Sequence, residues 1–477
     1  MPAASPLPSI AASRLKSANH DLTPPFLLEL DESLEPWRCT AILRTLPERR
    51  IVLLVNKDGK NAIAKLFFRD KDYHRELEGY QLLQTQQQPC AEILAHDDTS
   101  SFQYILFEYI DAPSLAALWQ QGRDRDQRIN TLCQAIPRIA ELHRVGLRQM
   151  DIHLDNFLCI EDQLVLIDYA SIQRDSAPLS SQLACHNFAH LIAQLAGDYS
   201  AYYPQLLSLY QQHVAISFSL QDLTTQVEQL RAKRWRHYER KIARDCSEFI
   251  AEQQFNSRLV LRRQSDSYAM RKLLQAPDAA MMQGVTLKQG NTATVSRVCI
   301  DQQSLVIKRY NIKSSLHAIN RALRPTRAWA SWRNAYKLRF EGLLTPLPIA
   351  LSEHRFGPLR SKAYLLCEHI EGKDLWQVFN DGEDSPLPLV MLEKQVVDMF
   401  EGLLAGKLSH GDLKGTNLIA TTEGLQIIDL DAMKSHSNEK KLKNALQRDL
   451  QRFLRNFNEQ QRQRFEELLS TFSAKLK

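Results

Sequence analysis

Two stretches of the sequence decide the fold: GLRQMDIHLDNFLCIEDQLVLIDYAS at residues 146–171 and GKLSHGDLKGTNLIATTEGLQIIDLDAM at residues 406–433. Each contains an aspartate, an asparagine in the pattern D-x-x-x-x-N, and a second aspartate behind an apolar segment, with the same interval between the aspartates. Because residue type, order and spacing agree, the sequence predicts that one structural unit occurs twice. The matched residues are Asp151, Asn156 and Asp168 in the first half, and Asp412, Asn417 and Asp429 in the second.

The segments upstream of these stretches also correspond. An apolar, β-branched strand carries a lysine in each half, in NAIAKLFF (Lys65) and in SLVIKRY (Lys308), and a helical stretch and a further strand follow. This order predicts an α+β fold with two consecutive units. We expect a disordered tail over 1–25, a first domain over 26–256 and a second domain over 257–477.

Composition excludes several other classes of protein. The 477 residues are 44% hydrophobic and 24% charged, a balance typical of folded proteins rather than disordered or fibrous ones. Glycine is scarce, at 16 residues, and neither a GxGxxG fingerprint nor a Walker loop is present. The eight cysteines form no C-x-x-C pair, so neither a zinc site nor a disulfide framework is expected.

The sequence also bears on where the protein works. Prolines interrupt the N-terminal segment where a secretory signal would need an apolar core, and no apolar run approaches the roughly 18 residues that span a bilayer. We therefore expect a cytoplasmic protein without a transmembrane segment. The net charge of +5 is too small to identify a partner.

The repeated residues suit phosphoryl transfer, which needs placement and charge neutralisation more than covalent help. A strand lysine can hold the phosphates of a nucleotide, and an aspartate can orient and deprotonate the attacking hydroxyl. Asparagine and aspartate oxygens suit Mg²⁺. The candidate bases are Asp151 and Asp412, and the candidate phosphate-binding lysines are Lys65 and Lys308. The candidate metal ligands are Asn156, Asp168, Asn417 and Asp429.

This set resembles the protein-kinase-like superfamily. DIHLDN at 151–156 is similar to the D-x-H-x-x-N loop of small-molecule phosphotransferases, and HGDLKGTN at 410–417 to the H-G-D-L-K-x-x-N loop of bacterial lipopolysaccharide kinases. RAWASWRNAYKL at 327–338, followed by LLTPLPIAL, resembles heptose and Kdo kinases of the lipopolysaccharide core. The resemblance implies two tandem protein-kinase-like bilobal domains, each with a small β-rich lobe and a larger helical lobe, that use ATP and Mg²⁺.

The first half departs from the superfamily's pattern. Glu76 is the expected partner of Lys65, with Glu78 as the alternative. The turn expected to cover the phosphates, RTLPERR at 44–50, contains no glycine, and therefore offers fewer backbone amides that can approach phosphate closely. Gln149 stands where the second half has a histidine.

The second half departs at other positions. Its phosphate-covering turn has one glycine, Gly290, in KQGNTAT. No acidic residue lies between Asn311 and Phe340, and Ser331 stands where the partner of Lys308 is expected. Either Lys308 finds another carboxylate or this site is weakened, and the sequence leaves open which half is the active one. Two further candidates lie where such folds link their lobes and contact adenine: Glu108 and Glu368.

Positive charge gathers in two clusters, which suit a solvated helix face or a polyanion. Because they accompany a sugar-kinase-like site, an anionic glycolipid is favoured over nucleic acid. The first cluster is Lys313, Arg321, Arg324, Arg327, Arg333, Lys337 and Arg339. The second is Arg231, Lys233, Arg234, Arg236, Arg240, Lys241 and Arg244, with Trp235 and Tyr238 among them.

The expected function is transfer of the γ-phosphate of ATP to a sugar hydroxyl, with heptose of the lipopolysaccharide inner core as the expected acceptor. The acceptor, a lipid A–core glycolipid, would be met at the cytoplasmic face of the inner membrane. Two alternatives remain: a nucleotide-binding pseudokinase that scaffolds envelope biosynthesis, and a kinase that acts on protein or on a small soluble alcohol.

Overall fold

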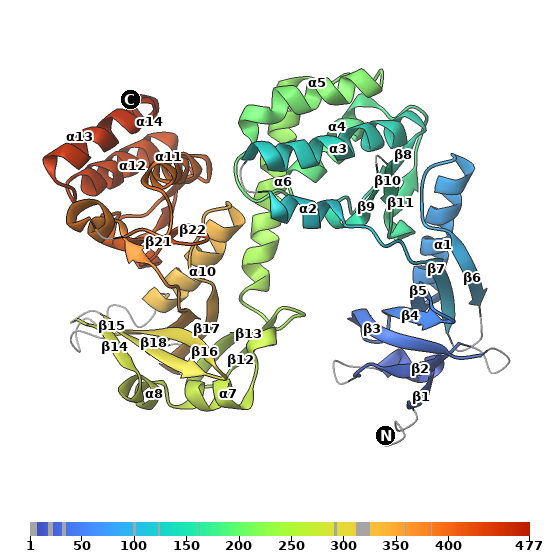
Figure 1. The fold of residues 1–477 in the computed structure, drawn as a ribbon, viewed down its shortest axis with the longest axis horizontal. Coiled ribbons are helices and arrows are strands. Elements are labelled where there is room, and N and C mark those ends of the chain that lie inside the picture. Colours follow the sequence, from blue (N-terminus) through green and yellow to red (C-terminus); the bar gives the residue numbers. More distant parts are fainter. Residues whose placement is uncertain are drawn as a thin grey trace. The chain divides into compact units, whose positions relative to one another are not determined.

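The computed structural model describes residues 7–17, 22–30, 35–98, 102–122, 125–161, 163–290, 293–311, 325–357, 359–382 and 384–477. The chain forms two compact units, one of residues 1–194 and 200–230 and the other of residues 195–199 and 231–477. Each unit has a seven-stranded sheet and a helical part (Figure 1), so the predicted α+β fold class is confirmed.

The sheet of the first unit has the order β1-β2-β3-β4-β5-β7-β6. Its strands are β1 (Ser9–Ala11), β2 (Phe26–Glu29), β3 (Trp37–Leu46), β4 (Arg50–Lys57), β5 (Lys60–Phe67), β6 (Ile93–Asp98) and β7 (Gln103–Glu108). Side chains alternate between the two faces of β4 and β5, and those on one face form part of the core. Leu53, Ala62 and Ala64 are fully buried there. Helix α1 (Asp70–Thr85) follows β5.

The tail that we expected to be disordered contains regular structure. Strand β1 pairs in parallel with β2, and the 3-10 helix η1 (Ala12–Ser17) follows it. Ala12 and Leu15 are buried in the same hydrophobic cluster as Phe26. Apolar burial therefore holds residues 9–17 against the sheet, which the proline-rich composition did not indicate.

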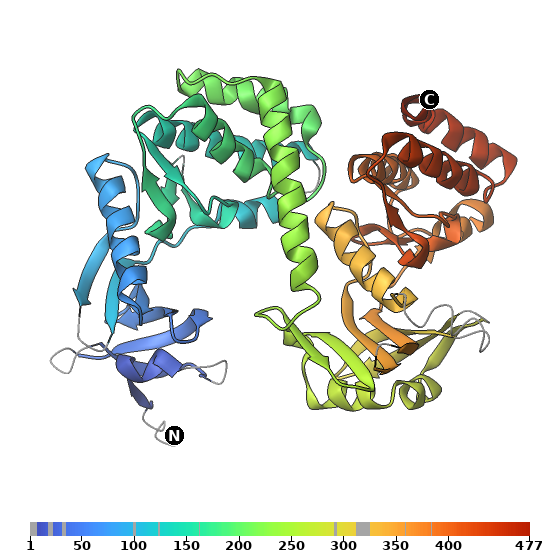
Figure 2. The same ribbon diagram turned by 180° about the vertical axis from the view of Figure 1, so that it is seen from behind.

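The helical part of the first unit carries the loop with the D-x-x-x-x-N pattern (Figure 2). Helix α3 packs against α5 and against the short strand β8, which leads into that loop. The helices are α2 (Leu115–Gln121), α3 (Arg125–Arg144), α4 (Ser181–Ile192), α5 (Tyr203–His213) and α6 (Leu220–Lys241), which runs on into the second unit. The short elements are β8 (Leu147–Gln149), η2 (Leu154–Asn156), β9 (Phe157–Ile160), β10 (Gln163–Leu166), η3 (Tyr169–Ser171), β11 (Ile172–Arg174) and η4 (Ser200–Tyr202).

The sheet of the second unit has the order β12-β13-β17-β18-β16-β15-β14 and is antiparallel throughout. The predicted domain boundary at 256–257 falls between its first two strands, which pair as a hairpin, so the sheet begins before that boundary. The strands are β12 (Phe249–Gln253), β13 (Ser257–Arg262), β14 (Val285–Gln289), β15 (Ala293–Ile300), β16 (Gln303–Tyr310), β17 (Pro348–Phe356) and β18 (Leu359–Glu368). Its short helices are η5 (Arg263–Ser265), α7 (Tyr268–Gln275) and α8 (Pro277–Gln283).

Helix α10 (Arg327–Phe340) packs on this sheet through Trp332, which is fully buried. The helical part that follows has an aromatic core around Phe400, Phe453 and Phe465. Its helices are α11 (Leu389–Ala405), α12 (Glu439–Leu454), α13 (Glu459–Leu468) and α14 (Ser470–Leu476). Its short elements are β19 (Lys373–Asp374), the π-helix η6 (Gln377–Asp381), β20 (Leu408–Ser409), η7 (Gly415–Asn417), β21 (Leu418–Thr421), β22 (Gly424–Ile427), η8 (Leu430–Ala432) and β23 (Lys434–Ser435).

Across the described parts of both units, no helix combines the length and the apolar character needed to cross a bilayer.

Candidate active site

The two D-x-x-x-x-N loops have the same internal hydrogen bond. The side-chain amide of Asn156 donates to the backbone carbonyl of Asp151 at 2.8 Å, and that of Asn417 donates to the carbonyl of Asp412 at 2.9 Å. Both asparagines are buried. Since the amide nitrogen is used within the loop, the carbonyl oxygen of each asparagine remains available as a ligand.

The second aspartates also share an unusual backbone conformation. Asp168 and Asp429 have φ values of 68° and 64°, in the left-handed region, and each lies immediately before a 3-10 helix. Each follows a buried strand that pairs with the strand after the loop asparagine. The hairpin therefore places the loop and the second aspartate side by side in both units.

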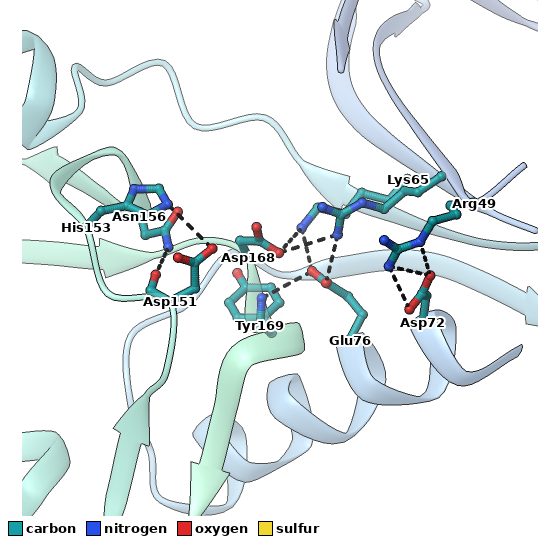
Figure 3. A network of polar contacts seen from close by, with 10 residues as sticks. Arg49, Lys65, Asp72, Glu76, Asp151, His153, Asn156, Asp168 and Tyr169 are labelled. Carbon is teal, nitrogen blue, oxygen red and sulfur yellow. Dashed lines mark hydrogen bonds and ion pairs between the residues drawn. The ribbon is translucent and has the colours of Figure 1, made fainter. Parts of the chain in front are cut away.

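In the first unit, Lys65, Glu76 and Asp168 form one polar network (Figure 3). The Lys65 ammonium is paired with Glu76, which is fully buried on α1, and lies 3.9 Å from the Asp168 carboxylate. Glu76 also accepts the backbone N–H of Tyr169 at 3.2 Å. The alternative partner, Glu78, is exposed.

Close packing of α1 brings Glu76 to this network. A Cβ atom at Gly79 would lie 1.9 Å from the backbone oxygen of Tyr169, so this helix position has no room for a side chain. In the second unit a side chain makes the corresponding contact between helix α10 and the turn after the second aspartate. There the Asn334 amide on α10 donates to the carbonyls of Leu430 and Met433 at 2.9 and 3.1 Å.

An arginine joins the first network. Arg50, the first residue of β4, lies 3.6 Å from Glu76 and 3.5 Å from Asp168. Burial would raise the pKa of the Asp168 carboxyl, but the charges of Lys65, Arg50 and Arg44 outweigh that effect and hold the pKa below its usual value. The Asp151 side chain is 72% exposed and lines a cavity of about 170 Å³ together with Asp168.

In the second unit, Lys308 has a different partner. Its ammonium is paired with the Asp429 carboxylate, and Ser331, which stands where a glutamate was expected, shares a 2.8 Å hydrogen bond with the Tyr310 hydroxyl instead. Burial lowers the pKa of Lys308, but Tyr310 and Asp429 outweigh it and raise that pKa above its usual value. Burial alone would raise the pKa of Asp429, but the charge of Lys308 holds that pKa below its usual value. The Asp429 carboxylate therefore stays charged.

These second-unit residues line a cavity of about 450 Å³, which is large enough for a small-molecule ligand. Its wall combines polar and apolar side chains. Lys308, Asn417 and Asp429 supply the polar part, while Val295, Val306 and Ile419 are among the apolar residues. Gly290 lies at the end of β14, whose residues Leu287 and Lys288 also face the cavity.

The predicted base Asp412 is on the same loop as Asn417. Its carboxylate is paired with Arg452 of α12 and lies 3.5 Å from Lys414, which lines the cavity. The Asp412 carboxylate is therefore flanked by two cations, one from α12 and one from its own loop.

The two glutamates predicted near adenine have a common structural use. Glu108 accepts the backbone N–H of Glu92 at 2.9 Å, and Glu368 accepts that of Leu347 at 2.7 Å. Glu368 and the next residue, His369, line the second-unit cavity. Each glutamate therefore ends one strand and binds the residue before the neighbouring strand, β6 or β17. The backbone N–H groups of Glu108, Glu368 and His369 are also hydrogen-bonded within the protein.

Sequence reasoning missed Asp449, which orders the loop of the second unit. This α12 carboxylate is buried and accepts the backbone N–H groups of His410 at 2.7 Å and Gly411 at 2.9 Å. In the first unit the corresponding contact is made by Asn187 of α4, which donates to the carbonyl of Gln149 at 2.8 Å. The available signal was a charged residue within the apolar stripe of α12.

The candidate metal ligands are few. No cluster of three or more His, Cys, Asp or Glu side chains suitable for a metal occurs in the part of the chain that the structure describes. A site for Mg²⁺ held with nucleotide phosphates needs only one or two protein oxygens. Asp429 and the Asn417 carbonyl oxygen fit that requirement in the second unit.

The basic clusters are mostly internally paired. Among the residues of the first cluster, Lys313, Arg321 and Arg324 lie outside the described residues. Arg327 pairs with Asp431, Arg333 with Glu239, and Lys337 with Glu341. In the second cluster, Trp235 is buried and packs 5.4 Å from Phe340, so it faces the core. The exposed members are Lys233, Arg236, Arg240 and Arg244.

Comparison with known proteins gave one family and several solved structures. Residues 280–472 match the model of the lipopolysaccharide kinase (Kdo/WaaP) family. A search of curated proteins gave no match. Among solved structures, WaaP in complex with acyl carrier protein is similar at 17% identity, over 42% of this chain and 87% of that chain, with a TM-score of 0.31. The PknI kinase domain of Mycobacterium tuberculosis is similar at 12% identity, over 41% and 95%, with a TM-score of 0.26.

Proposed function

We propose that the second unit transfers the γ-phosphate of ATP to a heptose hydroxyl of the lipopolysaccharide inner core, because residues 280–472 match the model of the lipopolysaccharide kinase (Kdo/WaaP) family. The chain is thus a phosphotransferase that acts on a core sugar, and the choice of heptose, of the nucleotide and of the working unit is our proposal. We also propose that both units are kinase-like domains in tandem.

One observation carries this assignment: Lys308, Asn417 and Asp429 line a single cavity of about 450 Å³ in the matched region. The lining combines apolar residues with charged and polar ones, as a site for an adenine ring and its phosphates would need. An adenine ring would lie against the lobe-linking segment at Glu368, and the turn that follows Gly290 would cover the phosphates. The phosphates would lie at Lys308, Asn417 and Asp429.

The roles follow from these positions. Lys308 would hold the α- and β-phosphates, and Asp412 would orient the sugar hydroxyl and accept its proton as the oxygen attacks the γ-phosphorus. Asn417 and Asp429 would hold Mg²⁺, which when bound neutralises phosphate charge. Lys414 lies 3.5 Å from Asp412 and would stabilise the charge that develops on the transferring group.

The first unit repeats the arrangement with one important difference. The residues at the corresponding positions are Lys65, Asp151, Asn156, Asp168 and Glu108, and Glu76 stands where the second unit has Ser331. However, Arg50 adds a second cation beside Asp168, the proposed metal ligand, at 3.5 Å. Since like charges repel, a divalent cation would be bound less well there than at Asp429. For this reason we assign phosphate transfer to the second unit.

The acceptor would be an anionic lipid A–core glycolipid at the cytoplasmic face of the inner membrane. The exposed residues Lys233, Arg236 and Arg240 share one face of α6, because they are spaced by three or four positions. A basic helix face attracts acidic head groups, so we propose that the protein is cytoplasmic and binds the membrane peripherally.

The test compares the two predicted bases in cells. A strain that lacks this protein is complemented with the wild type, with Asp412→Asn or with Asp151→Asn, and the phosphate content of its lipopolysaccharide core is measured by mass spectrometry. We expect Asp412→Asn to lose the core phosphate and Asp151→Asn to retain it, at equal protein levels. The reverse result would move the chemistry to the first unit. An unchanged core in the deletion strain would contradict the glycolipid assignment and favour a scaffold or another acceptor.

A further inference from the structure

A small cavity in the first unit is lined by four arginines. Its volume is about 170 Å³, and the guanidinium groups come from Arg44, Arg49, Arg50 and Arg75. Three of these residues belong to the β3–β4 hairpin and the fourth to α1. This concentration of cations is absent from the lining of the second-unit cavity, which has Lys288, Lys308, Arg327 and Lys414 dispersed over a larger wall.

The hairpin explains why arginine side chains face this space. In the second unit the equivalent turn contains Gly290, whereas the turn between β3 and β4 has no glycine and places Glu48 at a φ of 59°. Backbone amides can approach an anion closely when a glycine is present. Without one, long side chains must supply the positive groups, and guanidinium groups match phosphate oxygens in pairs.

Two of the four arginines are available to a ligand. Arg49 is paired with Asp72 through contacts of 3.1 to 3.3 Å, and Arg50 is shared between the buried Glu76 and the partly exposed Asp168. Arg44 and Arg75 have no hydrogen bond or ion pair with any other residue that the structure describes, and both are exposed. The Asp151 carboxylate also lines the cavity, but its side chain is 72% exposed, so water screens its charge.

The carboxylate that could hold a metal here is already occupied by cations. Asp168 lies 3.5 Å from Arg50 and 3.9 Å from Lys65. A divalent cation at Asp168 would have to displace these groups or remain beside them. The same cations attract an anion, so they favour its binding.

We propose that this cavity binds the terminal phosphate dianion of a sugar phosphate or of a nucleotide, without a divalent metal. Its volume is below the range of about 300–1,000 Å³ that encloses whole small-molecule ligands, so it accommodates a phosphate with the atoms next to it. Arg44 and Arg75 bind the phosphate oxygens, and Arg50 closes the inner side. This site goes beyond the proposed function, since it does not depend on which unit transfers phosphate.

Calorimetric titration of the full-length protein tests the site. Glucose 6-phosphate and ATP are the two probes, each titrated in EDTA and again with Mg²⁺. The proteins are the wild type, the double variant Arg44→Gln/Arg75→Gln, and Arg38→Gln, an exposed arginine of the same strand β3 that does not line the cavity. Thermal melting of each variant establishes that it is folded.

We expect binding in EDTA that the double variant weakens about 100-fold, as the loss of two charge-assisted contacts predicts, and that Arg38→Gln leaves unchanged. Loss confined to glucose 6-phosphate identifies a sugar phosphate as the ligand, and loss of ATP binding identifies a nucleotide. Absence of binding of both probes in EDTA, or wild-type affinity in the folded double variant, would overturn the proposal. A requirement for Mg²⁺ would overturn it as well.

Discussion

The Lys308 ammonium is paired with the Asp429 carboxylate, whereas its counterpart Lys65 is paired with Glu76. The carboxylate that neutralises the strand lysine therefore differs between the two units. In the first unit a helix supplies the carboxylate, and Asp168 is a secondary neighbour at 3.9 Å. In the second unit Ser331 occupies that helix position, so the lysine and the proposed metal ligand neutralise each other directly.

Replacing Lys308 with methionine is expected to weaken binding of Mg·ATP about tenfold or more and to abolish transfer. The variant removes the cation proposed for the phosphates and leaves Asp429 unpaired, which raises the pKa of that carboxyl. Nucleotide titration and phosphorylation of purified core lipopolysaccharide measure the two effects. Lys362→Met, at an exposed lysine of the neighbouring strand β18, is the matched control. Equal ATP affinity in the wild type and Lys308→Met would contradict the role of this lysine.

Glu76→Ala is expected to destabilise the first unit by about 3–5 kcal/mol. The substitution removes the main carboxylate partner of Lys65 and Arg50, so these two cations share Asp168 alone. Removing one partner of a buried ion pair typically costs about 3–5 kcal/mol of stability. Hydrogen exchange of α1 amides across a urea series measures the change. Glu78→Ala, two positions further along the same helix and exposed, should stay within about 0.5 kcal/mol of the wild type. Similar losses in both variants would count against the network.

Asp449→Ala is expected to lower kcat while Mg·ATP affinity stays close to that of the wild type. Asp449 contacts the backbone at His410 and Gly411, next to Asp412, and does not line the cavity. Its loss therefore disturbs the orientation of the proposed base rather than the nucleotide contacts. Asp449→Asn, which keeps one acceptor oxygen, should recover part of the rate, and Gln447→Ala on the exposed face of α12 should have no effect. A rise in the ATP dissociation constant as large as the fall in kcat would indicate general unfolding instead.

Local pattern predicted which short segments carry the candidate groups of both sites. Each D-x-x-x-x-N loop and each following aspartate lies within one short segment, so spacing alone predicted that they would meet. The mixed fold class was also predicted, because strands and helices differ in the period of their apolar residues. The roles of these residues remain predictions until activity is measured.

Contacts between distant segments were not predictable in this way. Arg50 lies in a hairpin that sequence reasoning examined only for glycine, yet it reaches Asp168 over a separation of 118 residues. The partner of Lys308 was left open, and it proved to be the candidate metal ligand itself. The contact between the helix and the turn after the second aspartate is made by close backbone packing at Gly79 in the first unit and by a side-chain hydrogen bond of Asn334 in the second. No propensity distinguishes such residues from ordinary helix positions.

Histidine 143 gives the first unit a pH-dependent stability. His143 is a packed residue near the end of α3, and it is fully buried. Asn187 accepts a hydrogen bond from Nε2 at 3.0 Å, which leaves Nδ1 to accept from the Tyr210 hydroxyl at 2.8 Å. This arrangement needs the neutral ring. Burial lowers the pKa of His143 to about 4, and the charge of Arg148 acts in the same direction. The hydrogen bond to Asn187 raises this pKa but does not cancel the effect of burial.

The first unit should therefore lose stability as the pH falls from about 6.5, the pKa of an unfolded histidine, to about 4. Because the folded-state pKa is the lower one, the unfolded chain binds the extra proton, and the stabilisation is complete only above pH 6.5. The shift corresponds to about 3 kcal/mol. Pulse proteolysis in urea at pH 7.5 and pH 5, with first-unit fragments identified by mass spectrometry, measures it. His143→Gln should flatten this dependence even if it lowers stability at both pH values, whereas His74→Gln, at an exposed histidine of α1, should preserve it. An equal pH dependence in His143→Gln and the wild type would assign the acid sensitivity to other groups.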